Sequence, residues 1–281
     1  MERLPSDCIL CGSRRKELLI EKESWQVFRC MSCGLGFLDP RPSEEDIKKL
    51  YNREYFACSY DSGVDPDSAE FKRRLSQESH RVRFFRGIKK QGRILDIGCG
   101  NGYFLAACRA AGYEVQGLDI SDWAADYALN KLGISVITGE IGDVKIPPDS
   151  YDIISMWHFL EHTGNPSTTL SRVLTWLKKN GILIIDVPNY ESTDARSMWN
   201  EWVGWQLPYH LYHFTPKSLE MLLAISGLHI EKRRTYHSES VKNRLRKIHV
   251  PGILARLIAR MYSGNSLAVV SGRDSKTEEG Q

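Results

Sequence analysis

From residue 93 onward, apolar segments of strand length alternate with segments of helical periodicity. Seven segments have the character of strands, from RILDIG at residue 93 to NSLAVVSG at residue 265. Stretches such as SDWAADYALNKL separate most of them. Strands that alternate with helices predict a parallel sheet covered on both faces, because each crossover helix packs against the sheet. The continuous apolar runs ILIIDV and DIISMW agree with strands buried on both sides.

The first predicted strand runs into a loop that contains Gly98, Gly100 and Gly102. A dinucleotide fingerprint would place its third glycine at the position of Tyr103. The loop therefore allows a ligand to approach the backbone closely but does not match a pyrophosphate site. Asp119 ends the second predicted strand, where a carboxylate can accept hydrogen bonds from both hydroxyls of a ribose.

Two C-x-x-C pairs, each followed by glycine, precede the sheet region. Their cysteines are Cys8, Cys11, Cys30 and Cys33. Four thiolates satisfy the tetrahedral preference of Zn²⁺ and leave no open coordination position, so we predict a structural zinc ribbon. The chain has seven cysteines, an odd number, which together with the paired spacing favours a reducing compartment over a disulfide framework. The N-terminal MERLPSD lacks a secretory apolar region, and we expect a cytoplasmic protein.

These motifs resemble those of the class I S-adenosylmethionine-dependent methyltransferases. ILDIGCGNGYFL is similar to their first motif, GLDIS to their second, and TGEIGDVKIPPDSYDIISMWHFLEH to their third and fourth. The ribbon and the following FLDPRPSEEDIKKLYNREYF are similar to the front of bacterial methyltransferases of sugar and cell-surface polysaccharide synthesis. The resemblance implies an α/β fold with a doubly wound, seven-stranded, mostly parallel, Rossmann-like sheet and an antiparallel last strand.

The resemblance also implies S-adenosylmethionine as the cofactor and assigns residues to it. The residues at its aminoacyl end would be Asp96, Gly98, Gly100 and Gly102. Asp119 would bind the ribose, and Glu140 would reach the adenine amino group from a position where many members have aspartate. Trp157 and His158 would line the methionine arm.

Two histidines are the candidate catalytic residues. A hydroxyl acceptor must lose its proton, and histidine accepts protons near neutral pH. His162 lies in WHFLEHTGNP, and His210 lies in the aromatic segment 198–214. Alternatives stay open for both: Glu161 and His162 could anchor the helix that follows, and the aromatic rings could seal the sheet edge instead of stacking on an acceptor.

Positive charge is concentrated near the C-terminus. Residues 232–260 carry nine lysines and arginines against one acid, Glu239, in a chain whose net charge is only +3. The body of the protein is therefore acidic, which argues against a nucleic-acid partner. Residues 253–261 read as a basic amphipathic helix. Residues 242–262 could contact an anionic membrane surface, namely the inner face of the cell membrane. Alternatively, the helix could dock on the protein and leave its basic face in solvent.

We therefore predict four segments: a zinc ribbon (1–40), a helical connector (41–92), a methyltransferase domain (93–272) and a disordered tail (273–281). The predicted acceptor is a small molecule, a hydroxyl of a sugar or of a lipid-linked glycan, with carbon or nitrogen as less favoured acceptor atoms. Two alternatives are an RNA methyltransferase that grips the strand with its ribbon and basic segment, and a non-catalytic scaffold that binds the cofactor. The sequence indicates neither the acceptor nor the oligomeric state.

Overall fold

The computed structural model describes residues 7–50 and 63–274. Residues 51–62 of the expected connector, with Cys58, and residues 275–281 of the expected tail lie outside the described residues. Within the described ranges, no helix combines the length and apolarity needed to cross a bilayer.

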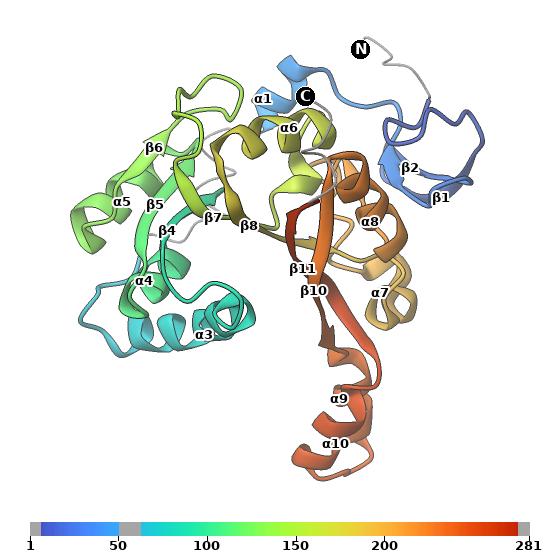
Figure 1. Ribbon diagram of the computed structural model, residues 1–281. Coiled ribbons are helices and arrows are strands. Elements are labelled where there is room, and N and C mark those ends of the chain that lie inside the picture. The colour runs from blue at the N-terminus through green and yellow to red at the C-terminus, as the bar shows by residue number, and fades with distance from the viewer. Residues whose placement is uncertain (1–6, 51–62, 275–281) are drawn as a thin grey trace. The chain divides into compact units, whose positions relative to one another are not determined.

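Seven strands form one sheet, and each matches a strand expected from the sequence (Figure 1). In spatial order they are β10 (Leu228–His237), β11 (Ser263–Arg273), β8 (Leu177–Pro188), β7 (Tyr151–Trp157), β4 (Arg93–Ile97), β5 (Glu114–Asp119) and β6 (Val136–Thr138). β4 pairs in parallel with β5 and β7, and β5 pairs in parallel with β6. The expected doubly wound, mostly parallel sheet is confirmed.

The core of this sheet lies on both of its faces. Ile94 and Leu95 are consecutive residues of β4, and both are fully buried, as are Ile153 and Ile154 of β7. Because successive side chains of a strand point to opposite faces, both faces of the central strands are covered.

The order of the strands reverses at β4. The chain continues from β4 to β5 and β6 on one side, and then crosses to β7 on the other side of β4. In open α/β sheets, ligands bind at the carboxyl ends of the strands next to such a reversal. The segment that begins at Gly98 after β4 and the one that begins at His158 after β7 both lie at this point.

Helices connect the strands, and several of them begin at a side-chain cap. Ser121 Oγ accepts a hydrogen bond from Ala124 N at the start of α5 (Asp122–Leu132), and Thr215 forms a capping box with Ser218 in α8 (Pro216–Ile225). The other helices of this region are α3 (Ala69–Phe85), α4 (Tyr103–Ala110), α6 (Pro166–Trp176) and α7 (Thr193–Met198), with 3₁₀ turns η1 (Leu160–His162) and η2 (Trp199–Glu201).

A second sheet has four strands in the order β1-β2-β3-β9. The first three belong to the N-terminal segment: β1 (Lys16–Lys22), β2 (Trp25–Cys30) and β3 (Gly36–Leu38). The fourth, β9 (Tyr212–His213), comes from the aromatic segment, and its His213 pairs antiparallel with Gly36. The expected ribbon is therefore completed by residues far along the chain. α1 (Glu44–Leu50) follows, and Asp46 N donates to Ser43 Oγ at its start.

The chain forms two compact units. One consists of Met1–Ile47, Leu160–Ser167 and Asp186–Val269, and the other of Lys48–Phe159, Thr168–Ile185 and Val270–Gln281. The sequence led us to expect a separate ribbon domain at the N-terminus. In this division, the N-terminal residues instead belong to the same unit as residues 186–269. β8 and β11 each contribute residues to both units.

A helical hairpin lies at the far end of β10 and β11 (Figure 1). Its helices are α9 (Glu239–Lys247) and α10 (Gly252–Ala259). Only Ala255 and Ala259 of α10 are buried, whereas Ile253 and Met261 are each 81% exposed. The apolar face expected to dock on the protein thus points to solvent.

Candidate functional site

The glycine loop after β4 adopts a backbone that side chains disfavour. Gly98, Gly100 and Gly102 have φ angles of +72°, +50° and +76°, all in the left-handed region. A Cβ at Gly98 would come within 2.8 Å of the Phe159 ring. Glycine at position 98 is therefore required both by conformation and by space.

Asp119 holds this loop in place. Its Oδ2 accepts a hydrogen bond from Gly100 N at 2.8 Å, and its Oδ1 accepts one from Ser121 N at 2.9 Å. Each carboxylate oxygen has a further lone pair, so both can still accept from a ligand hydroxyl. Burial raises the pKa of Asp119, and the two backbone donors oppose that shift. The residue predicted to bind a ribose is thus also a structural tie between β5 and the loop.

Asp96, on β4, is a buried carboxyl beside the loop. Burial raises its pKa to about 7, opposed by the hydroxyl of Ser155, which donates to Asp96 Oδ1 at 2.6 Å, and by the charge of Arg81. Glu78 and Asp119 raise the pKa further. Asp96 is therefore close to half ionised at neutral pH. Sequence reasoning missed Ser155, whose only signal was a polar residue inside the apolar run DIISMW.

The first turn of α4 is open to an anion. Gly102 is its N-cap, and this cap supplies no side-chain hydrogen bond, nor does the first turn contain an acidic residue. The N–H groups of a helix's first turn and the helix dipole favour negative charge there. A carboxylate of a small ligand fits this position chemically.

Trp157 is the last residue of β7 and His158 comes directly after it, where the sequence predicted them. The Trp157 ring packs edge-on against Phe104 at 5.3 Å, and the Arg81 guanidinium lies 4.7 Å from the Trp157 ring centroid. Trp157 Nε1 is buried and has no hydrogen-bond partner among the described residues. His158 is exposed and has a φ of +53°, a conformation that costs free energy and is concentrated at functional sites.

These residues share one edge of the sheet. Asp96, the glycines, Asp119, Trp157 and His158 all lie at or just beyond the carboxyl ends of β4, β5 and β7, which are neighbours. Glu140 is exposed and follows β6 at the same edge. The structure therefore brings the predicted cofactor residues to adjacent strand ends of one unit.

A second cluster is built from η1 and the segment before β9. The ligand atoms of Glu161, His162 and His210 lie within 4.8 Å of one another, and the two imidazole centroids are 4.6 Å apart. His162 Nδ1 lies 3.1 Å from Tyr209 O, and His210 Nδ1 lies 2.8 Å from Gly204 O. A carbonyl oxygen can only accept, so the Nδ1 of each imidazole carries a proton. The two predicted catalytic histidines are thus neighbours.

His213 is a further buried histidine in this region. Its ring centroid lies 6.2 Å from that of His210, and neither ring nitrogen has a hydrogen-bond partner among the described residues. Burial lowers the pKa of His213 well below its usual value, and the neighbouring His210 lowers it further. His213 is therefore a neutral imidazole. Its position in a two-residue strand left no periodic signal in the sequence.

The aromatic segment is mainly internal packing. Trp202 and Trp205 are each 1% exposed and contact each other edge-on at 5.2 Å. Trp202 Nε1 donates to Asn265 Oδ1, and Trp205 Nε1 donates to Trp199 O, both at 2.7 Å. Of the two alternatives for this segment, the burial of these two indoles favours internal packing over stacking on an acceptor. Trp199 remains 39% exposed.

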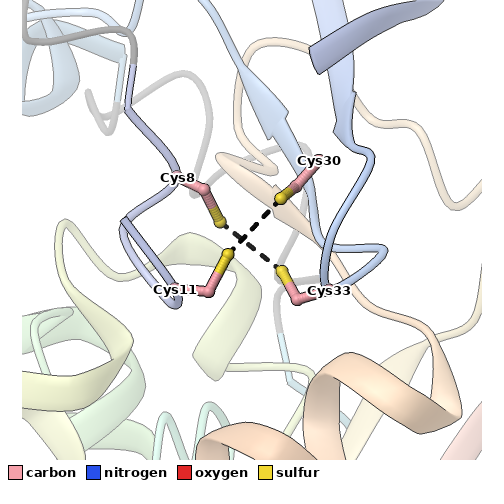
Figure 2. A group of neighbouring side chains, drawn as sticks. All are labelled: Cys8, Cys11, Cys30 and Cys33. Atoms are coloured by element: carbon pink, nitrogen blue, oxygen red, sulfur yellow. Dashed lines mark hydrogen bonds between the residues drawn. The ribbon is translucent and has the colours of Figure 1, made fainter. Parts of the chain in front are cut away.

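The four N-terminal cysteines converge on one point, as Figure 2 shows. The sulfurs of Cys8 and Cys33 are 3.5 Å apart, as are those of Cys11 and Cys30. Both pairs sit in matching turns: Gly12 N donates to Cys8 O, and Gly34 N donates to Cys30 O. The glycines at positions 12 and 34 have φ angles of +68° and +79°. This arrangement offers four converging soft ligands, the donor set that Zn²⁺ prefers.

The cysteine turns are joined to the histidine segment. A Cβ at Gly36 would come within 2.9 Å of His213 Cβ, so β3 and β9 are in close contact. Leu38 N donates to Leu211 O at 3.0 Å, and Tyr190 OH donates to Gly34 O at 2.5 Å. The N-terminal sheet therefore fixes the backbone that carries His210 and His213.

Comparison with known proteins gives consistent matches. The profile of a family described as a methyltransferase domain matches residues 69–233. The ubiquinone biosynthesis O-methyltransferase of Burkholderia orbicola (strain MC0-3) is 28% identical over 159 residues, which cover 52% of this chain and 68% of that protein. That of Azoarcus sp. (strain BH72) is 28% identical over 103 residues, covering 34% of this chain and 44% of that protein.

Solved structures match in fold. A SAM-dependent methyltransferase from Archaeoglobus fulgidus has a TM-score of 0.54 at 23% identity, covering 72% of this chain and 93% of that one. A possible histamine N-methyltransferase from Thermotoga maritima has a TM-score of 0.53 at 17% identity, covering 81% of this chain and 98% of that one.

The raised pKa of Asp96 predicts a pH-dependent stability. The folded ligand-free protein holds the proton more tightly than the unfolded chain, whose aspartates titrate near about 4. This contribution is complete below about pH 4 and is lost as the pH rises through about 7. Urea denaturation at several pH values should therefore give a steeper loss of stability between pH 5 and 8 for the wild type than for Asp96→Asn. The exposed Asp122→Asn is the control, and equal slopes for all three proteins would contradict the assignment.

Proposed function

We propose that this chain, which belongs to the methyltransferase-domain family and is an S-adenosylmethionine-dependent methyltransferase, methylates a hydroxyl of a small molecule. The acceptor we propose is a sugar or a lipid-linked glycan intermediate. The observation that carries the proposal is the glycine loop tied to Asp119 at the carboxyl edge of the sheet. S-adenosylmethionine, the cofactor of this family, supplies a methyl group on a positively charged sulfur.

We propose that the residues at this edge hold the cofactor. The open first turn of α4 and the unpartnered Trp157 N–H are donors suited to its carboxylate, and the Asp96 carboxylate is suited to its ammonium group. The free lone pairs of Asp119 suit the ribose hydroxyls. Glu140 would reach the adenine amino group, while His158 and the glycine loop would border the methionine arm. Each of these donors and acceptors has a matching group on the cofactor.

An oxygen acceptor is supported by two observations. The relatives that match over about half of this chain are named O-methyltransferases. In addition, the histidine cluster brings two imidazoles together, and an imidazole can accept the proton that a hydroxyl must lose when the O–CH₃ bond forms. We propose that His162 and His210 promote this loss, either by accepting the proton or by binding a cation that acidifies the hydroxyl.

We propose that the four cysteines bind one structural Zn²⁺. All four thiols point to a common centre, so no position is left open for a substrate. The pairing of β3 with β9 gives the zinc a second consequence, because the metal would stabilise the backbone around His210 and His213.

We also propose that the α9–α10 hairpin contacts an anionic membrane surface. Exposed apolar side chains of the hairpin include Ile248, Ile253, Leu254, Leu257 and Met261. Six basic residues flank them: Lys242, Arg244, Arg246, Lys247, Arg256 and Arg260. An exposed apolar face with a basic border complements acidic lipid head groups, and a membrane location suits a lipid-linked acceptor. The two competing functions are an RNA methyltransferase and a cofactor-binding scaffold without catalysis.

Cofactor binding is tested by calorimetry with S-adenosylhomocysteine. We expect binding by the wild type and no response to NAD. Asp119→Ala should weaken binding by about 1.5–3 kcal/mol, the usual contribution of hydrogen bonds to a charged group. Asp119→Ala should also lower thermal stability because Gly100 N and Ser121 N lose their acceptor. The control is Asp122→Ala in the first turn of α5. Tight NAD binding, or unchanged affinity in Asp119→Ala, would rule out the assignment.

The histidines are tested by turnover. His210→Ala and His162→Ala should each lower turnover by about 10²–10⁴-fold, the range for lost acid–base catalysis, with the larger effect at His210. S-adenosylhomocysteine affinity should change little, because Asp119 and the glycine loop are intact. The assay follows S-adenosylhomocysteine formation with nucleotide sugars, lipid-linked sugars and RNA as acceptors, and the exposed His229→Ala is the control. Near-normal turnover in both variants would show that alignment alone carries the reaction.

The zinc is tested by elemental analysis of protein purified without added metal. We expect one zinc per chain, absent in Cys30→Ser and retained in Ser32→Ala from the same turn. Because β9 pairs with β3, Cys30→Ser should also change the fluorescence of Trp205, whose ring lies 5.0 Å from that of His213. S-adenosylhomocysteine binding should persist, since its proposed residues belong to the other compact unit. Zinc-free wild type with four freely titratable thiols would contradict the proposal.

The hairpin is tested by sedimentation with lipid vesicles. The wild type should sediment with vesicles that contain phosphatidylglycerol, less so at high salt, and weakly with pure phosphatidylcholine. The double variant Ile253→Ser/Met261→Ser should bind at least about 10-fold less, because it loses buried apolar area. The control is Ile225→Ser on α8, an apolar residue that is 60% exposed but lies outside the hairpin. Equal loss in the control, or no sedimentation of the wild type, would exclude this contact.

A further inference from the structure

We propose that Glu161, His162 and His210 form a second metal site, which takes a divalent first-row transition-metal ion. The site is distinct from the cysteine cluster in its donors, since it offers one carboxylate oxygen and two imidazole nitrogens. Two histidines and one carboxylate are the donor set of catalytic zinc and of non-haem iron sites, which keep further positions open.

The three donor atoms are already close to a coordination geometry. They lie within 4.8 Å of one another. Two ligands that bind one ion at about 2.1 Å are at most about 4.2 Å apart. Side-chain movements of about 1 Å would therefore bring all three into contact with a common ion. Among the described residues, only this group and the four cysteines bring three or more potential ligand atoms together in this way.

The orientation of both imidazoles is that of metal ligands. Histidine ligands almost always donate their second N–H to a carbonyl or a carboxylate, which fixes the ring and leaves the other nitrogen for the metal. His162 and His210 both do so, through Nδ1 to the carbonyls of Tyr209 and Gly204. Metal binding by His162 and His210 would therefore use the Nε2 of each ring.

The backbone holds the donors together. Leu211 N donates to Glu161 O at 2.9 Å, so the strand segment that follows His210 is bonded to the turn that carries the other two ligands. Tyr212 OH donates to Gly164 O at 2.9 Å, which adds a second link between the same segments. Pairing of β9 with β3 extends this support to the N-terminal sheet. A site built on linked segments is rigid enough to select for an ion.

Burial favours an ion in this place. Glu161 is fully buried and His210 is 4% exposed. A carboxylate removed from water is stabilised strongly by a nearby cation, and a divalent ion supplies that charge at close range.

The role of the ion in deprotonating an acceptor hydroxyl rests on the proposed function. The binding of the ion does not depend on that function. Three protein donors leave positions for oxygen ligands, which a hydroxyl of the acceptor could occupy. A divalent ion lowers the pKa of a bound hydroxyl, so that the O–H proton passes to water and the oxygen becomes a nucleophile at neutral pH. The contribution of His162 and His210 to deprotonation would then be made through the metal.

The test uses the full-length protein with its cysteine site filled with zinc and Co²⁺ alone as the probe. We expect the wild type to take up one further equivalent of Co²⁺, with the weak visible absorption of a nitrogen and oxygen site and without thiolate charge transfer. Glu161→Gln, which keeps the side-chain shape, and His210→Ala should both lose this saturable uptake. His229→Ala should bind as the wild type does, and circular dichroism checks that each variant is folded.

The outcomes separate this inference from the proposed function. S-adenosylhomocysteine binding is measured on the same samples and should persist in all variants. Wild type that takes up no further Co²⁺ would overturn the metal site, whatever the variants do, and would leave the methyltransferase assignment intact. Unchanged uptake in both Glu161→Gln and His210→Ala would also overturn it. Failure of S-adenosylhomocysteine binding alongside normal Co²⁺ uptake would instead count against the cofactor assignment.

Discussion

Pairing of β4 along both of its edges determines where the chemistry of this protein is placed. β4 bonds in parallel register to β5 on one side and to β7 on the other, so three carboxyl ends meet at one edge of the sheet. The residues just beyond those ends are separated by many positions in the chain but become neighbours. Fully buried consecutive residues in β4 and β7 make this register costly to shift, because a slip of one residue would exchange the two faces.

The same edge gathers acidic groups that burial makes sensitive to a ligand. Asp96 and Asp119 both have raised pKa values, with burial as the largest cause in each case. Both carboxylate oxygens of Asp119 accept backbone hydrogen bonds, one of them from Gly100 in the loop. This contact stabilises the loop, whose three glycines are in the left-handed region, before any ligand binds. Preorganisation of this kind reduces the entropy lost on binding. A cation near Asp96 would favour its ionised form, so cofactor binding and proton release are expected to be linked.

Local sequence patterns were sufficient to predict the seven strands and the cysteine cluster, since each depends on a few neighbouring residues. Local patterns could not predict the contacts between segments that are distant in the sequence. β9 has two residues and no periodicity, so its pairing with β3 could not be foreseen. The sequence around Trp202 and Trp205 is compatible with stacking on a ligand and with packing against each other. Only the fold distinguishes these two cases.

The N-terminal sheet gives a physical reason for a structural metal in this protein. A two-residue strand such as β9 cannot hold its own conformation, because isolated strand pairs are at best marginally stable in water. Structural zinc contributes on the order of 10–16 kcal/mol to the folding of small domains, far more than a short strand pair requires. Part of that free energy can stabilise β3 and, through Gly36 and His213, the segment that carries His210. The cysteine cluster would thereby position the histidines without contacting any substrate.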